Sequence, residues 1–158
     1  MRLGKQIPLI TSNQETRSIS APCNEKYPIP CRLFILCGDY TKNIFDLARR
    51  HPKRLKAASL EPQLQEVEAH TSKVFQDTIA AFRDSDENLA RRVMEDYKEE
   101  ISTDCENMTD DIIGGKVTDL QSPEAAAVVL YARFLKRIGS HSRNIATSIV
   151  NPFHRIGY

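Results

Sequence analysis

Apolar residues recur every three or four positions in four stretches of the sequence, and each stretch ends at a proline, a glycine pair or a short polar break. This spacing places the apolar side chains on one face of an α-helix. The predicted helices span residues 30–50, 60–83, 86–113 and 123–151, each to within a few positions. No stretch alternates clearly between apolar and polar residues, as a half-buried strand does. The pattern therefore predicts an all-α protein.

The three longer helices can bury their apolar faces together in an up-down three-helix bundle. The helix at 30–50 precedes them and has an apolar face of its own, so we expect it to lie against the bundle or against a partner. The residues before it show neither a helical nor an alternating period. The predicted organisation is an irregular N-terminal arm at 1–28 and a helical bundle at 29–158.

Polar residues and prolines mark the predicted helix ends. Pro52 ends the first helix, and Ser59 is expected to cap the second. The segment Asp84–Asp86 supplies a break and a cap for the third helix, and Ser122 is followed by a proline in the preferred order for a helix start.

Charge excludes some classes of protein. The chain has 22 Lys and Arg against 21 Asp and Glu, so its net charge of +1 gives no reason to expect nucleic-acid binding. Residues 57–131 hold 17 acidic and 6 basic side chains, between two basic flanks that they would attract. No apolar run approaches the roughly 20 residues that span a bilayer, and the first residues do not resemble a secretory signal. We expect a cytoplasmic protein.

The cysteines lack the spacing of a zinc site, because no C-x-x-C pair occurs and no histidine lies near them at ligand spacing. We expect free, buried thiols. The four residues are Cys23, Cys31, Cys37 and Cys105.

One segment of the sequence occurs twice. Arg32–Ala48 aligns with Arg133–Ile149 at an offset of 101 residues, which pairs Gly38 with Gly139. Glycine inside a helix costs about 1 kcal/mol relative to alanine, so its recurrence predicts a close neighbouring helix at both positions. The repeat predicts that both helices dock in the same way.

The same alignment pairs Asn43 with Asn144. A polar group at a buried seam needs a partner, so both asparagines are expected to form hydrogen bonds across the bundle.

Phe134–Ala146 resembles the final-helix signature of the PhoU family, and Leu36–Ile44 is similar to the same signature at the end of that family's first repeat. The resemblance covers residues 31–151 or so. It implies one full three-helix repeat preceded by the last helix of another. The resemblance also implies packing roles for the signature residues Gly38, Asn43, Gly139, His141 and Asn144.

The resemblance implies a cytoplasmic, non-enzymatic regulator of phosphate transport and phosphate-starvation signalling, with a phosphate transporter or a sensor histidine kinase as its partner. A homodimer is expected through the face left by the missing helices. The same domain forms the cytoplasmic tail of sodium-phosphate cotransporters, which is the first alternative. A helical scaffold, or a phosphotransfer bundle using His141, is the second.

Some members of the family bind iron or zinc clusters through acidic pairs one helical turn apart. Three expected acidic positions are instead occupied by Ile35, Lys136 and Ser140. The remaining candidate ligands are Asp39, Asp96, Glu100 and Asp104.

An ion-pair seam is an alternative to metal at Asp96, Glu100 and Asp104, with Lys136 and Arg137 supplying the cations. A solvated acidic face is the third possibility, since surface pairs contribute little stability. Basic residues could also bind an acidic partner or anionic lipid head groups at the membrane surface. The candidates are Arg133, Lys136, Arg137 and Arg143, together with Arg49, Arg50, Lys53, Arg54 and Lys56.

Overall fold

Every regular element is a helix across residues 28–51 and 53–151, which the computed structural model describes. The main helices are α1 (Pro28–Arg50), α2 (Glu61–Asp84), α3 (Glu87–Asp96), α4 (Thr103–Ile113) and α5 (Ser122–Val150). Their ends agree with the predicted helices to within two residues. Nearly all of the predicted arm at 1–28 lies outside the described residues, although Pro28 itself opens α1.

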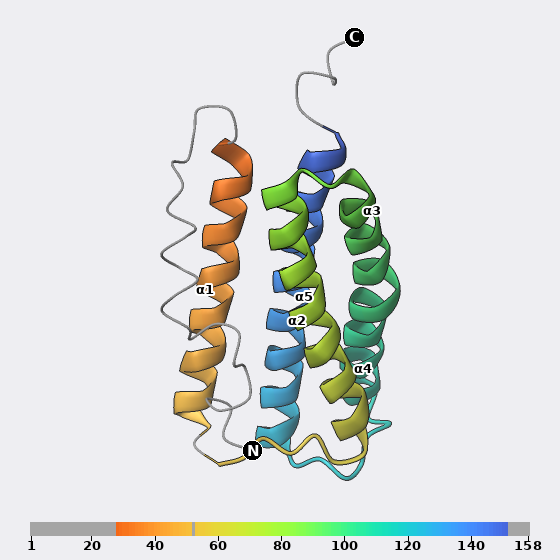
Figure 1. Ribbon diagram of the computed structural model, residues 1–158. Coiled ribbons are helices and arrows are strands. Elements are labelled where there is room, and N and C mark those ends of the chain that lie inside the picture. The colour runs from red at the N-terminus through yellow and green to blue at the C-terminus, as the bar shows by residue number, and fades with distance from the viewer. Residues whose placement is uncertain (1–27, 52, 152–158) are drawn as a thin grey trace.

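The helices form a bundle in which α2 and α5 lie between two flanking elements (Figure 1). The continuous α3 to α4 segment packs on one side of this central pair, and α1 packs on the other. α1 runs antiparallel to α5, as the colour gradient shows. The predicted three-helix bundle with an additional preceding helix is therefore confirmed. No helix in the described part of the chain is long and apolar enough to cross a membrane.

The core of the bundle is apolar side chains from α2, the α3 to α4 segment and α5. Burial of such a side chain contributes about 1.5–3 kcal/mol, which makes this core the main source of stability. The side chains with almost no exposed surface include Val67, Val74, Val93, Ile101, Met108, Val128, Tyr131 and Ile145.

α1 covers the central pair through the apolar face that the sequence predicted. Cys37 Sγ donates to the carbonyl oxygen of Ile138 over 3.9 Å, and the Tyr40 ring stacks on His141 with centroids 5.6 Å apart. Both contacts join residues 101 positions apart, which are equivalents in the repeat. The two repeat helices therefore contact each other through the same face.

Asp86 caps α3 as predicted, because its carboxylate accepts hydrogen bonds from the amides of Asn88 and Leu89. Ser59 is not the cap of α2. A single 3₁₀ turn, η2 (Ala58–Leu60), precedes that helix, and Ser59 instead donates from its amide and hydroxyl to Asp119. The bond to the α4 to α5 loop replaces the local one that residue types alone favoured.

Ser122 does not cap α5 either. It is the first helical residue, Gln121 occupies the cap position, and no side chain there caps the helix. The neighbouring proline keeps its expected place in the first turn.

A π-helical segment, η3 (Tyr97–Ser102), separates α3 from α4, where the sequence predicted one regular helix. Its apolar residues Val93, Tyr97, Ile101 and Cys105 are spaced by four, and each such step drifts about 40° around an α-helix. A π turn takes an extra residue, which offsets this drift. All four side chains remain buried as a result.

The predicted free thiols are confirmed at Cys37 and Cys105, which are both buried and unbridged. Burial raises the pKa of each thiol to about 12. Both cysteines are therefore neutral near pH 7 and pack as small apolar groups. The predictions for Cys23 and for the Cys31 side chain lie outside the described residues.

Candidate functional site

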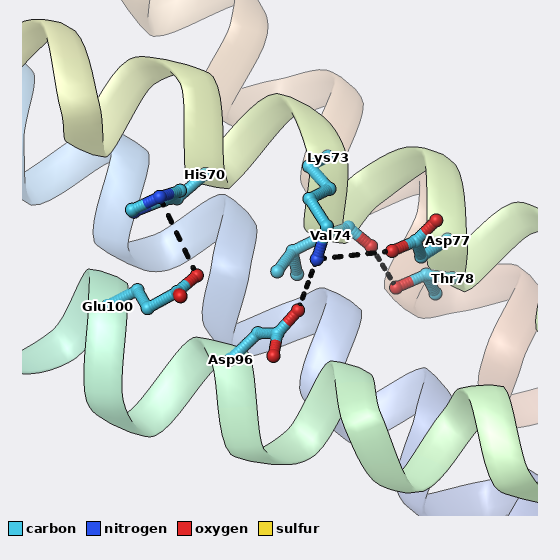
Figure 2. Close-up of polar contacts among 7 residues, drawn as sticks. All are labelled: His70, Lys73, Val74, Asp77, Thr78, Asp96 and Glu100. Atoms are coloured by element: carbon cyan, nitrogen blue, oxygen red, sulfur yellow. Dashed lines mark hydrogen bonds and ion pairs between the residues drawn. The ribbon is translucent and has the colours of Figure 1, made fainter.

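We call the series Asp96, Glu100 and Asp104 on the α3 to α4 segment the acidic stripe. Polar and charged side chains from α2 meet its first two members along one edge of the bundle (Figure 2). Lys73 Nζ donates to Asp96 Oδ2 and lies 3.6 Å from Asp77 Oδ2 on its own helix. One turn away, His70 Nε2 lies 3.7 Å from Glu100 Oε2. We call these five residues the charged seam.

The charged seam is only partly shielded from water. The Lys73 side chain is 57% exposed and that of Asp96 is 24% exposed. The hydrogen bond that Lys73 donates to Asp96 raises the pKa of Lys73. Ion pairs with this exposure contribute about 0–1 kcal/mol each, so the seam aligns the two helices more than it stabilises them.

The seam has the predicted chemistry but different cations. Lys136 does not reach Asp96 or Glu100, and instead its ammonium binds Glu106 of α4. The acidic stripe faces α2, whereas Lys136 projects from α5 toward α4. Lys73 therefore pairs with the stripe at Asp96, and His70 lies beside it at Glu100.

The predicted cluster of metal ligands does not assemble. Asp39 is exposed on α1, across the central helix pair from the acidic stripe (Figure 1). Asp96 accepts a hydrogen bond from Lys73. The carboxylate of Asp104 lies 3.5 Å from the amide nitrogen of Gln63. Among the described residues, no three His, Cys, Asp or Glu side chains converge on one point. These positions do not fit an iron or zinc cluster.

The prediction that the two repeat helices dock in the same way is wrong, because their signature glycines have unlike surroundings. A Cβ built on Gly139 would lie 2.9 Å from Tyr97 Cδ2 and 3.4 Å from Ile101 Cδ1, so the α3 to η3 segment requires glycine there. A Cβ on Gly38 would have no atom within 4 Å. The prediction of a close neighbour is confirmed at Gly139 and wrong at Gly38, because no helix of the described chain covers that side of α1.

The prediction of asparagine hydrogen bonds across the bundle is wrong. Asn43 and Asn144 are both exposed, although each precedes a buried isoleucine. One position corresponds to about 100° around a helix, which turns the asparagine side chains outward while Ile44 and Ile145 enter the core.

His141 lies in the contact between α1 and α5. Its ring stacks on Tyr40, and its Nδ1 is buried without a hydrogen-bond partner. Burial, together with the positive charge of Arg137, lowers the pKa of His141. The geometry supports the packing role that the family signature implied.

The predicted partner-binding residues of α5 are divided between two environments. Lys136 is occupied by Glu106, and the Arg143 guanidinium lies 6.0 Å from the centre of the Tyr97 ring. Arg137 is exposed, beside His141. Arg137 and Arg143 are both exposed, whereas Lys136 is partly buried in its ion pair, so two of the three residues are presented to solvent.

The other basic group forms a surface at the end of α1. We call it the basic corner, and its members are all exposed. Arg54 lies 3.7 Å from Glu61, and within the described residues the other members form no ion pair. Pairing with the acidic middle of the chain therefore does not account for this surface. The members are Arg49, Arg50, Lys53, Arg54 and Lys56.

The motifs of the sequence did not point to His70, Lys73 and Asp77. They lie at spacings of three and four on α2, outside its apolar positions, which marks one polar face of that helix. That periodicity was a usable signal for a surface opposite the acidic stripe.

Comparison with known protein families gives a match over the three-helix bundle. A family model described as the PhoU domain matches residues 64–149, slightly more than half of the 158 residues. The matched region spans most of α2, all of α3, η3 and α4, and α5 almost to its end. No curated protein and no solved structure matches the chain.

Proposed function

The chain belongs to the PhoU domain family, and on this premise we propose that it is a cytoplasmic regulatory protein of phosphate transport and phosphate-starvation signalling. It acts by binding other proteins and not by catalysis. The proposed partner is a phosphate transporter, a membrane sensor histidine kinase or both.

The observation that carries this proposal is the family match across the three-helix bundle. Two features of the fold support it. The match ends in the signature helix α5, and the Gly139 position in that helix is needed for contact with the α3 to η3 segment.

The basic corner is the proposed docking surface for an acidic patch on the partner protein. Five exposed cations within eight positions of sequence create a local positive potential on a chain that is nearly neutral overall. Such a surface accelerates association with an acidic partner and weakens with added salt.

A complementation experiment tests the regulatory role. The chain is expressed in a bacterial strain that lacks its own PhoU protein and carries a reporter of phosphate starvation. We expect reporter expression at high phosphate to fall when the chain is present. A reporter that stays fully active, with the chain folded and abundant, would contradict the proposal.

A charge-reversed variant tests the docking surface. Changing the five residues of the basic corner to Glu is expected to abolish repression and to remove co-purification with the transporter or kinase. The matched control reverses Arg92 and Lys98, which are exposed on the α3 to η3 segment, and should leave both readouts unchanged. Circular dichroism checks that both variants fold.

Binding to lipid vesicles distinguishes docking on a protein partner from docking on the membrane itself. Binding of the unmodified chain to anionic vesicles, lost at high salt, would assign the basic corner to peripheral membrane attachment. We expect no binding to vesicles that lack the transporter or kinase.

A further inference from the structure

One face of α1 is apolar and open to solvent. Ile35 is 65% exposed and Phe45 is 61% exposed. Gly38 and Lys42 complete the face, so the series 35, 38, 42 and 45 alternates steps of three and four. This is the spacing of a helix-packing seam.

The repeat relates three residues of this face to a part of α5 that packs against a helix, whereas Ile35 corresponds to Lys136. At the offset of 101 residues, Gly38, Lys42 and Phe45 correspond to Gly139, Arg143 and Ala146. On α5 the corresponding face is covered by the α3 to η3 segment, where Tyr97 lies against Gly139 and beneath Arg143. On α1 the described chain provides no such cover.

The charges beside the open face are also unpaired. Arg32, Asp39, Lys42 and Asp46 form no ion pair within the described residues. Arg32, Asp39 and Asp46 lie seven apart, along one edge of the apolar series. This edge is positive near the start of α1 and negative toward its end.

We propose that a second copy of this chain covers the open face, with the two α1 helices packed antiparallel about a two-fold axis. An axis beside the middle of α1 places Ile35 opposite the partner's Phe45 and Gly38 opposite the partner's Lys42. Each apolar side chain then meets another apolar side chain, and the glycines allow the helices to approach closely.

The same axis pairs opposite charges along the edge. Arg32 lies opposite the partner's Asp46, and the symmetry repeats this pair at the other end of the interface. Lys42 lies near the partner's Asp39 at the centre. Edge charges of this kind set the orientation of paired helices, and a parallel arrangement would instead place Arg32 against its own copy.

Sedimentation equilibrium of the full chain over a concentration series tests the dimer. We expect a reversible dimer that Phe45→Glu weakens by roughly tenfold or more, because a charge replaces an apolar contact twice per dimer. The matched control is Ile113→Glu on α4, where the isoleucine is 74% exposed and lies outside the proposed interface. It should leave the association constant unchanged.

A charge-swap experiment tests the antiparallel geometry. Arg32→Glu and Asp46→Arg should each weaken self-association, because each places like charges opposite one another at both ends. Mixing the two variants should restore association as a heterodimer, since every pair then joins opposite charges. Non-specific stickiness of α1 would not produce this rescue.

Three results would overturn the proposal. The chain could remain monomeric throughout the series, Ile113→Glu could weaken the dimer as much as Phe45→Glu does, or the mixed variants could fail to associate. Reporter repression in the complementation experiment is a separate readout, so failure of the dimer and failure of the regulatory role can be told apart.

Discussion

α1 and α5 carry the same sequence element in different surroundings. Their equivalent faces pack against each other, at Cys37 with Ile138 and at Tyr40 with His141. Their other faces differ, because the α3 to η3 segment covers α5 and leaves α1 open. Similar residues therefore become core or surface according to the neighbouring helix and not according to their own type.

The largest expected difference is at the buried isoleucines. Ile145 on α5 has no exposed surface, and its equivalent Ile44 on α1 is 3% exposed. We expect Ile145→Ala to lower the free energy of unfolding by about 4 kcal/mol and Ile44→Ala by about 2 kcal/mol. Urea denaturation measures both values, and equal costs would show that α1 is as fully packed as α5.

Hydrogen exchange gives a second comparison of Ile44 and Ile145. Because α1 packs on one side only, Ile44→Ala should increase exchange mainly in α1, whereas Ile145→Ala should increase it throughout the bundle. Uniform loss of protection in both variants would contradict the difference in packing between α1 and α5.

The glycines should respond with opposite signs. Gly38→Ala adds a Cβ in open space and should stabilise the fold by about 0.5–1 kcal/mol through the helix preference of alanine. Gly139→Ala forces Tyr97 to move and should destabilise it by about 1 kcal/mol. Thermal denaturation at low protein concentration distinguishes them, and a shift in the same direction would contradict the difference in packing.

A smaller effect is expected at the equivalent cations. Arg143→Ala removes the contact with Tyr97 and should cost about 0.5 kcal/mol, whereas Lys42→Ala should be neutral in the monomer. Urea denaturation below the concentration of dimerisation makes the comparison. A larger cost at Lys42 would indicate an intramolecular partner for that residue.

The smallest effect is a pH dependence at the α1 to α5 contact. Burial and the charge of Arg137 lower the pKa of His141 below its ordinary 6.5, so the folded chain binds this proton less readily than the unfolded chain. The stability that neutral His141 contributes is fully present above pH 6.5. It is lost as the pH falls through the pKa of His141 in the folded chain. His141→Gln should flatten the stability profile there, and an unchanged profile would remove His141 as its source.

Local signals in the sequence predicted the helices well. Apolar spacing and breaking residues located each helix, and the segment Asp84–Asp86 was identified as a break and a cap because the bonds of its cap, Asp86, are to near neighbours. Ser59 and Lys136 were assigned wrongly for the opposite reason. Asp119 and Glu106, their actual partners, lie in other elements, and only their positions in space made them available.

The sequence by itself determined that this chain is helical, where its helices begin and end, and which family it belongs to, because these depend on residue order along one chain. The tertiary structure decided that the acidic stripe meets Lys73 and His70, that Gly139 is enclosed, and that Gly38 is open. Those outcomes depend on which helix lies beside which, and the energies of contact and desolvation act only between residues that packing has brought together.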